Sequence, residues 1–244
     1  MMDSLSHDTH LHMDLYEDMP CLIKEIEQNK IYTIAVTNLP VLFEKLNNKI
    51  QNKYILLALG FHPELISEYK SNIHQMWQYL SNTKYIGEVG LELRNASIED
   101  KNNQIDFFKE LIQRCDEIGN KVLSVHSKGG EKEILSIIGS KFNGNVILHW
   151  YSGALKNLEK AIKYGYYFSI NYSMVISNKG RKIIELIPNE KLLIESDGPF
   201  IKMKNKIFRP KDLNEIIVEL AKLKRITTSD MKNILHKNFK QLLQ

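Results

Sequence analysis

Asp8-Thr9-His10-Leu11-His12 ends the first strand-like stretch of the chain and contains its first two candidate metal ligands. Side chains two residues apart on a strand point to the same face, so His10 and His12 can converge on one metal ion. One His-x-His pair is a weak signal, because a pair of surface histidines is the commoner explanation. A metal site therefore requires further ligands at other strand ends.

The chain alternates strand-like and helix-like segments along its whole length. Eight stretches are nearly continuously apolar, as strands buried on both faces of a parallel sheet are. These predicted strands are Ser4–Thr9, Tyr32–Thr37, Tyr54–Leu59, Tyr85–Val89, Lys121–Val125, Asn145–Leu148, Tyr166–Ile170 and Leu192–Glu195. Eight strands alternating with helices predict an α/β fold, a (β/α)8 TIM barrel forming a single domain over residues 1–244. A doubly wound open sheet is the alternative, but it usually has a glycine-rich loop after its first strand.

Helical periodicity fills the segments between these strands. The clearest helix is Glu99–Ile118, where Ser97-x-x-Asp100 forms a predicted N-terminal cap and Gly119 ends the helix. Thr227-x-x-Asp230 is expected to cap a final helix that runs to the C-terminus. The other predicted helices are Leu22–Asn29, Leu42–Ile50, Glu68–Leu80, Glu131–Ile138, Leu155–Lys163, Lys179–Leu186 and Lys211–Lys224.

The composition is that of an ordinary globular protein, with 43% apolar and 25% charged residues. A net charge of +4 permits a polyanionic substrate without requiring one. Cys21 and Cys115 are far apart in sequence and are predicted to be two buried free thiols in a reducing compartment. The polar N-terminus does not resemble a signal peptide, and the apolar runs are too short to cross a membrane. We therefore expect a cytoplasmic protein.

Metal-ligating side chains follow the predicted strands at their C-terminal ends, where barrel enzymes keep their active sites. They are His10, His12, Glu88, His126, His149 and Asp197, and His62 stands at a further strand end. Imidazole and carboxylate hold zinc, manganese, iron or cobalt, and this set is too large for one tetrahedral ion. It suits two divalent ions that share a carboxylate. The remaining histidines are expected to be incidental or at the surface: His7, His74 and His236.

The same strand ends resemble, in order, the motifs of the TatD family of metal-dependent deoxyribonucleases. The matching motifs are D-x-H-x-H at Asp8–His12, G-x-H-P at Gly60–Pro63, G-E-x-G-L at Gly87–Leu91, the H-x-R histidine at His126, H-x-F-S-G at His149–Gly153 and E-[ST]-D-x-P at Glu195–Pro199. The resemblance covers essentially the whole chain and implies a barrel of the amidohydrolase type. It also implies the metal ligands, with Glu88 bridging: His10, His12, Glu88, His126, His149 and Asp197.

This resemblance implies DNA as the substrate and two divalent ions, which would be zinc, magnesium or manganese. Glu88, Asp197 and His62 are then the catalytic residues, with Asp197 taking a proton from the attacking water. His62 would contact the substrate phosphate. The other expected substrate contacts are Lys128, Trp150, Tyr151 and Arg209.

The loop after the eighth predicted strand combines basic and aromatic residues, namely Phe200, Lys202, Lys204, Lys206, Phe208 and Arg209. Such a combination can follow a single DNA strand by charge and base stacking. A solvated basic loop explains the pattern equally well.

Three positions depart from the family pattern. Glu92 stands where the family usually has Asp, and Lys128 stands where it has the arginine of H-x-R. Lysine holds a phosphate as a point charge and lacks the bidentate guanidinium. Arg209-Pro210 also lacks the Asn of the family's R-N-x-P. None of these changes affects an expected metal ligand, so they concern the choice of substrate.

Four stretches resemble more closely the TatD-like subunit (QatD) of the Qat anti-phage defence system. They are 149–153, 167–171, 177–181 and 195–200. This resemblance implies three partners: an ATPase, a QueC-like enzyme and a further subunit.

Two alternative functions remain open. One is a hydrolase of the same barrel class that acts on a C–N or ester bond, such as a nucleobase deaminase. Glu88 disfavours it, because such enzymes usually have a bridging lysine there. The other is a subunit of an assembly whose metal site is structural or acts only with partners.

Overall fold

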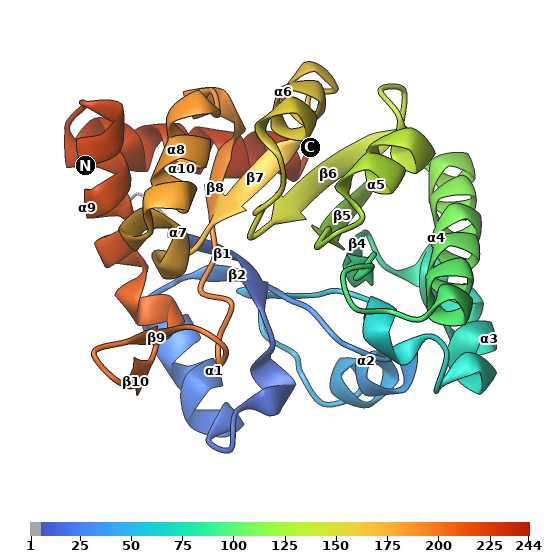
Figure 1. Ribbon diagram of the computed structural model, residues 1–244. Coiled ribbons are helices and arrows are strands. Elements are labelled where there is room, and N and C mark those ends of the chain that lie inside the picture. The colour runs from blue at the N-terminus through green and yellow to red at the C-terminus, as the bar shows by residue number, and fades with distance from the viewer. Residues whose placement is uncertain (1–5) are drawn as a thin grey trace. The chain divides into compact units, whose positions relative to one another are not determined.

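The computed structural model describes residues 6–244, so the predicted start of the first strand at Ser4–Leu5 and most of the polar N-terminus lie outside the described residues. The chain forms two compact units, whose elements are labelled in Figure 1. Unit 1 contains the residues up to Ala35, Gln51–Leu56 and Phe168–Gln244. Unit 2 contains Val36–Ile50 and Leu57–Tyr167. β3 (Ile55–Leu57) crosses the boundary between these ranges, and β7 (Tyr167–Ile170) begins one residue before unit 1 resumes at Phe168.

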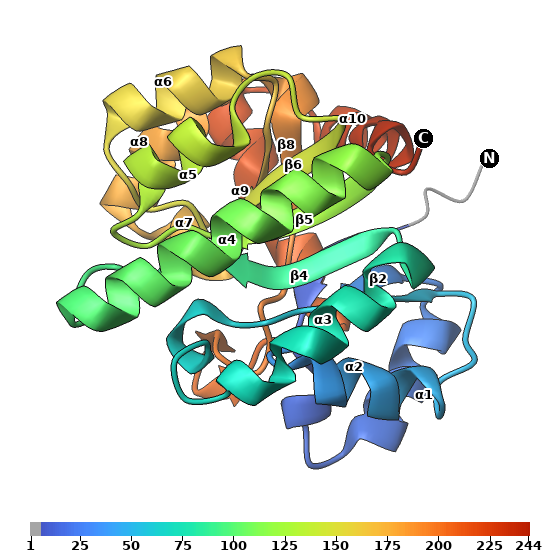
Figure 2. The ribbon, with the colours of Figure 1, turned by 90° about the vertical axis from the view of Figure 1, so that its right-hand side faces the viewer.

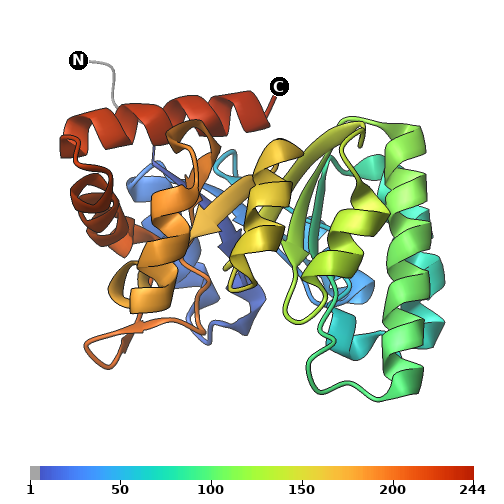
Figure 3. The same ribbon diagram turned by 45° about the horizontal axis from the view of Figure 1, so that its top comes forward.

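Unit 1 brings strands from the two ends of the chain together. β1 (His7–Leu11) pairs in parallel with β2 (Tyr32–Ala35), and β7 (Tyr167–Ile170) pairs in parallel with β8 (Leu192–Ile194). The Thr9 hydroxyl donates a hydrogen bond of 3.1 Å to the carbonyl oxygen of Ile194, which joins β1 to β8. Figure 3 shows α9 and α10 of this unit side by side. The helices of unit 1 are α1 (Met19–Gln28), α7 (Tyr172–Ile176), α8 (Asn178–Leu186), α9 (Leu213–Lys224) and α10 (Thr228–Leu242).

Unit 2 contains three buried parallel strands in chain order. They are β4 (Tyr85–Gly90), β5 (Lys121–His126) and β6 (Gly144–His149). Figure 2 shows α4 (Ile98–Ile118) lying along β4 and β5, and its apolar stripe is buried there. The other helices of unit 2 are α2 (Pro40–Asn47), α3 (Ile73–Tyr79), α5 (Glu131–Ile138) and α6 (Leu155–Lys163).

All eight predicted strands are confirmed, with ends that differ by a few residues. The predicted helix caps are confirmed as well. The Ser97 hydroxyl accepts from the backbone N–H of Asp100 at 3.1 Å, and the Thr227 hydroxyl accepts from that of Asp230 at 3.0 Å. Gly119 ends α4 with a left-handed φ of 74°.

One short helix and two short strands have no counterpart in the sequence prediction. α7 has only five residues, and it begins where the Asn171 side chain accepts from the backbone N–H of Met174 at 3.1 Å. β9 (Lys202–Met203) and β10 (Lys206–Ile207) form a short hairpin in the loop after β8. Its turn uses positive φ angles at Lys204 and Asn205, where sequence reasoning looks for glycine.

The predicted helix Glu68–Leu80 is α3 flanked by 3-10 turns. The 3-10 turns of the described residues are Met13–Leu15, Pro63–Leu65, Lys70–Asn72, Leu80–Asn82, Asn189–Lys191 and Pro210–Asp212.

Two predictions about burial are wrong. Both cysteines are free, but Cys21 is exposed, because it lies on the solvent side of α1 while Leu22 and Ile26 are buried. Cys115 is buried on α4, and burial raises the pKa of its thiol to about 12. His7 is not at the surface: it is 2% exposed and stacks on Phe239 of α10. Within residues 6–244, no helix is both long and apolar enough to cross a membrane.

Candidate metal centre

In unit 1, His10, His12 and Asp197 form a compact group that we call the histidine–aspartate cluster. The two Nε2 atoms lie 3.2 Å apart, and the Asp197 carboxylate lies 3.9 Å from His10 Nε2 and 3.8 Å from His12 Nε2. All three side chains are buried. The two histidines thus share one face, as their spacing predicts, and they offer three ligand atoms together with Asp197.

Backbone hydrogen bonds hold this cluster together. The N–H of Asp197 donates to the carbonyl oxygen of His10 at 2.9 Å, and the N–H of His12 donates to that of Gly198 at 3.0 Å. One oxygen of Asp8 accepts from the backbone N–H groups of Ser196 at 2.9 Å and His10 at 3.2 Å. Asp8 is fully buried, and burial raises its pKa to about 7 although these hydrogen bonds oppose the shift.

The Glu195 carboxylate, which directly follows β8, ties the Asp197 segment to β7. It accepts from Asn171 Nδ2 at 3.0 Å and from the Ser169 hydroxyl, and all three side chains are buried. The positions of two ligand segments in unit 1 are therefore set by hydrogen bonds in its interior.

In unit 2, His62, Glu88, His126 and His149 form a second group, the glutamate–histidine cluster. A single carboxylate oxygen, Glu88 Oε1, lies 2.8 Å from His126 Nδ1, 3.0 Å from His149 Nε2 and 3.6 Å from His62 Nε2. Glu88 is 3% exposed. His62 Nδ1 accepts from the backbone N–H of Glu64 at 3.3 Å, so in neutral His62 the proton is on Nε2, which faces Glu88. This tautomer makes His62 a hydrogen-bond donor.

Glycines let the backbone approach Glu88 closely. A Cβ at Gly60 would overlap the carbonyl oxygen of Thr37 and the backbone of Gly87 and Glu88. Gly90 has a φ of 137°, and a Cβ there would overlap the backbone of His126. The motif glycines are thus required by close packing around the carboxylate.

The second ring nitrogen of His126 faces another carboxylate. Its Nε2 lies 3.1 Å from Glu92 Oε2, and Lys128 Nζ lies 3.0 Å from the same oxygen. Burial opposes ionisation of Glu92, but the hydrogen bonds from His126 and Lys128 outweigh it and lower its pKa to about 2. Burial likewise lowers the pKa of His126, but Glu88 and Glu92 outweigh it and leave that pKa raised. Glu92 therefore orients the imidazole of His126 and pairs with Lys128.

A pocket of about 320 Å³ opens beside His126 and His149 in unit 2. Arg94 and Lys128 line it, so two cationic groups face the space next to the glutamate–histidine cluster. Sequence reasoning missed Arg94, because it belongs to no motif quoted above. It also missed Gln104, a buried α4 side chain whose Oε1 accepts from the backbone N–H of Glu92 at 2.9 Å.

The four residues expected to contact the substrate lie in different surroundings. Lys128 and Trp150 line the pocket, and Trp150 is 38% exposed. Tyr151 is buried, and its hydroxyl donates to the carbonyl oxygen of Ala154 at 2.7 Å, which holds the loop. Arg209, in unit 1, pairs with Asp18 at 3.0 Å and with Glu25 at 3.3 Å.

Phe200 lies close to the histidine–aspartate cluster. Its ring is 58% exposed and meets the ring of His12 edge to face, with 5.1 Å between centroids. The β9–β10 hairpin follows, and its Lys202, Lys204 and Lys206 are all exposed.

Comparison with known proteins identifies the family. The family described as TatD related DNase matches residues 7–244, which is nearly the whole chain. The chain belongs to the TatD family. It is 29% identical over 196 residues to an uncharacterized metal-dependent hydrolase of Methanocaldococcus jannaschii, a match that covers 78% of this chain and 76% of that one. It is 22% identical to the deoxyribonuclease TATDN3 of Homo sapiens, with 95% of this chain and 92% of the relative covered.

Solved structures confirm the predicted fold for this TatD family member. The TatD homologue YjjV of Escherichia coli superposes with a TM-score of 0.83 at 20% identity, covering 97% of both chains. A TatD family hydrolase of Entamoeba histolytica superposes with a TM-score of 0.77 at 16% identity, covering 98% of this chain and 97% of that one. A phosphotriesterase homology protein of Escherichia coli with phosphate in its active site gives a TM-score of 0.64 at 13% identity, covering 99% of both. The fold is therefore the TIM barrel of the amidohydrolase type.

Proposed function

We propose that this TatD family member hydrolyses DNA phosphodiester bonds with two divalent metal ions, and that residues 1–244 act as one hydrolase domain. The observation that carries the proposal is Glu88, a buried carboxylate with one oxygen within 3.6 Å of three imidazole nitrogens. A carboxylate in such a position can bridge two ions. The ions would be held by His10, His12, Glu88, His126, His149 and Asp197.

The donor sets fit divalent metal ions. Each cluster combines imidazole nitrogens with a buried carboxylate, the ligands that zinc and manganese accept, and only His62 and His126 are partly exposed among the cluster residues. In the histidine–aspartate cluster two Nε2 atoms face each other at 3.2 Å, as two ligands of one ion do. When bound, such ions lower the pKa of a water molecule and polarise a phosphoryl oxygen.

The protein's own groups supply the remaining chemistry. Water attacks phosphorus, the new P–O bond forms, and the P–O bond to the leaving nucleotide breaks. The Asp197 carboxylate accepts the proton of the attacking water. The Nε2–H of His62, the Lys128 ammonium and the Arg94 guanidinium, a group that can replace the arginine of H-x-R, donate to the phosphoryl oxygens.

The relatives support this choice of substrate. A matching family is described as TatD related DNase, and a human relative is named a deoxyribonuclease. A bacterial protein of the same fold carries phosphate in its active site. Two cationic side chains beside the glutamate–histidine cluster fit the same anion.

The test combines metal counting with cleavage assays. Wild type, Glu88→Gln, Asp197→Asn and the exposed control Glu117→Gln are purified and analysed for bound metal. Each is assayed on single- and double-stranded DNA with Mg²⁺, Mn²⁺ or Zn²⁺. We expect close to two ions in the wild type and in Glu117→Gln, and a loss of turnover of about a thousandfold in the other two variants. Near-normal turnover in both, with the fold intact, would overturn the proposal.

We also propose that the chain acts in the cytoplasm with the Qat defence proteins, the ATPase, the QueC-like enzyme and the further subunit. The sequence resemblance at residues 177–181 supports this, and Ile176 beside it is 57% exposed at the end of α7. Co-purification of the partners with the wild type, and its loss in Ile176→Lys, is the expected result. Equal recovery in Ile176→Lys would place the contact elsewhere, and no co-purification with the wild type would reject the assignment.

A further inference from the structure

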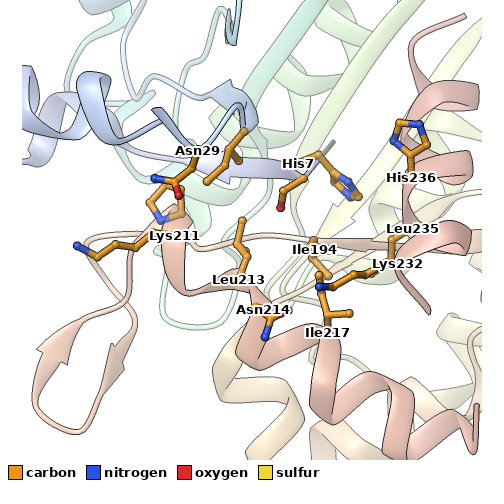
Figure 4. A pocket seen from close by; sticks show the side chains of 13 residues that line it. His7, Asn29, Ile194, Lys211, Leu213, Asn214, Ile217, Lys232, Leu235 and His236 are labelled. Atoms are coloured by element: carbon orange, nitrogen blue, oxygen red, sulfur yellow. The ribbon is translucent and has the colours of Figure 1, made fainter. Parts of the chain in front are cut away.

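A second pocket lies in unit 1, and its volume is about 200 Å³ (Figure 4). It is built from β1, the end of α1, the 3-10 turn before α9, α9 and α10. Among the described residues, none of those lining it belongs to the histidine–aspartate cluster. The proposed hydrolysis gives this pocket no role.

Two histidines line this pocket, and each has one buried ring nitrogen that lacks a partner among the described residues. His7 is 2% exposed, and within residues 6–244 its Nε2 has no hydrogen-bond partner. The Nδ1 of His236 is also buried, and no residue in the described part of the chain is its partner. Burial and the neighbouring His236 lower the pKa of His7 to about 3, so its ring is neutral at pH 7 and offers one N–H and one lone pair. Buried polar atoms are normally satisfied, so these two nitrogens indicate a ligand or ordered water.

The charges around the pocket favour an anion. Figure 4 shows Lys232 extending from α10 across the pocket toward α9, where Asn214 lies. Lys211, the second lysine of the lining, is held by Glu25 at 2.7 Å. Among the lining residues that the structure describes, no side chain is a carboxylate. Lys232 is thus a positive charge without a compensating acid in the pocket wall.

The rest of the lining is mixed, because Ser6 and Asn29 add polar groups beside the apolar residues. Ile31, Ile194, Ile217 and Leu235 face the pocket alongside the polar groups. The pocket volume of about 200 Å³ is several times the roughly 30 Å³ that one water molecule occupies in the liquid, so the pocket has room for more than a single water. A lining that combines apolar side chains with several placed polar groups can hold a small molecule that has both an apolar body and a polar group.

We propose that this pocket binds a small organic anion, a phosphate monoester or a carboxylate with an apolar body, at a site distinct from the metal ligands. The anionic group lies against Lys232 and Asn214, and the two histidines donate to its polar atoms. The apolar body packs on the isoleucines and Leu235. The inference does not depend on the proposed nuclease activity.

The test uses the intact chain and two probes, phenyl phosphate and benzoate, followed by calorimetry and by the NMR signals of the histidine rings. Asn214→Asp keeps the shape of an exposed side chain and adds a negative charge to the wall, and Lys232→Gln removes the positive charge. Lys240→Gln, an exposed lysine of α10 outside the pocket, is the matched control. Thermal unfolding verifies that each variant folds.

We expect saturable binding of at least one probe, weakened about tenfold or more in Asn214→Asp and Lys232→Gln and unchanged in Lys240→Gln. The ring signals of His7 and His236 should shift with the same saturation. A preference for one probe identifies the anionic group. Binding that is equal in all variants would place the anion elsewhere, for example at the metal ligands, and would overturn the proposal. A lack of saturation by about 10 mM with both probes would show that the pocket holds only water.

Discussion

The histidine–aspartate cluster and the glutamate–histidine cluster contain the same kinds of ligand but are held in different ways. In unit 1, backbone N–H and carbonyl groups join the two ligand segments, and the buried carboxylates of Asp8 and Glu195 accept hydrogen bonds behind them. In unit 2, side chains orient one another, because Glu88 meets three imidazoles and Glu92 joins His126 to Lys128.

This difference predicts how each cluster responds to mutation. Hydrogen bonds to buried backbone groups are part of the fold, and losing them leaves unsatisfied polar atoms. Contacts between side chains at a pocket set the orientation of a ligand, and losing them affects the site more than the fold. The supporting residues of unit 1 should therefore control stability, and those of unit 2 should control metal affinity.

The largest effect is expected for Asp8→Ala. The backbone N–H groups of Ser196 and His10 would lose their shared acceptor, and each buried unsatisfied group costs about 1–3 kcal/mol. We expect the free energy of unfolding, measured with urea in the metal-free protein, to fall by about 3 kcal/mol. Asp8→Asn keeps an acceptor oxygen and should recover most of this loss. Equal stability of Asp8→Ala and wild type would show that the backbone alone holds the cluster.

Glu92→Gln should lower metal affinity and leave stability nearly unchanged, the reverse of Asp8→Ala. The carboxylate of Glu92 orients His126, so its loss should weaken metal binding about 10- to 100-fold while the urea midpoint hardly changes. Calorimetric titration with Zn²⁺ or Mn²⁺ measures the first effect. Glu92→Asp, which introduces the family's usual residue, tests the position of the carboxylate. Lys128→Gln tests the ion pair between Glu92 and Lys128. If Glu92→Gln lowers stability and leaves metal affinity intact, the contrast between the clusters is wrong.

The two clusters also show what sequence can predict. The position of His10 and His12 on one face follows from the two-residue period of a strand, and β1 has that geometry. The eight strands were predictable because each is an apolar run bounded by a helical pattern. Gly60 was predictable as a motif residue, but its reason, a close approach to the Glu88 backbone, is visible only in three dimensions.

Other features depend on contacts that sequence does not contain. Arg209 sits in a basic loop, yet Asp18 and Glu25, nearly two hundred residues earlier, hold its guanidinium. Tyr151 follows an expected ligand, yet its hydroxyl is used by the neighbouring loop backbone. His7 shares β1 with His10 but packs on Phe239 of α10. In each case the side chain is held by a partner that the sequence pattern does not reveal.

His7 gives a pH prediction that is independent of both clusters. Its pKa is about 3 in the folded protein, mainly through burial, against 6.5 for the free side chain. Its stabilising contribution is therefore complete above pH 6.5 and is lost as the pH falls toward 3. Between pH 7.5 and 5.5 the free energy of unfolding of the wild type should fall by about 1.4 kcal/mol more than that of His7→Phe. The Phe side chain preserves the stacking on Phe239 but does not titrate. Urea unfolding at pH 7.5 and 5.5 measures this difference, with exposed His74→Gln as the control. Parallel losses in wild type and His7→Phe would contradict the assignment.

The smallest effect is expected for a change at Arg209. The prediction compares this ion-paired side chain with the exposed lysines of the same loop. Its guanidinium is paired with Asp18 and Glu25 and stands over the Tyr16 ring at 5.2 Å, so Arg209→Gln should change the KM for DNA by less than about twofold. Replacing the three hairpin lysines with Gln should instead reduce the slope of log affinity against log salt by about 2, since each phosphate contact on a single strand contributes about 0.7. Filter binding of single-stranded DNA from 50 to 300 mM salt measures both slopes. A slope that changes in Arg209→Gln and not in the lysine variant would mean that the held cation contacts DNA and that the exposed hairpin is only solvated.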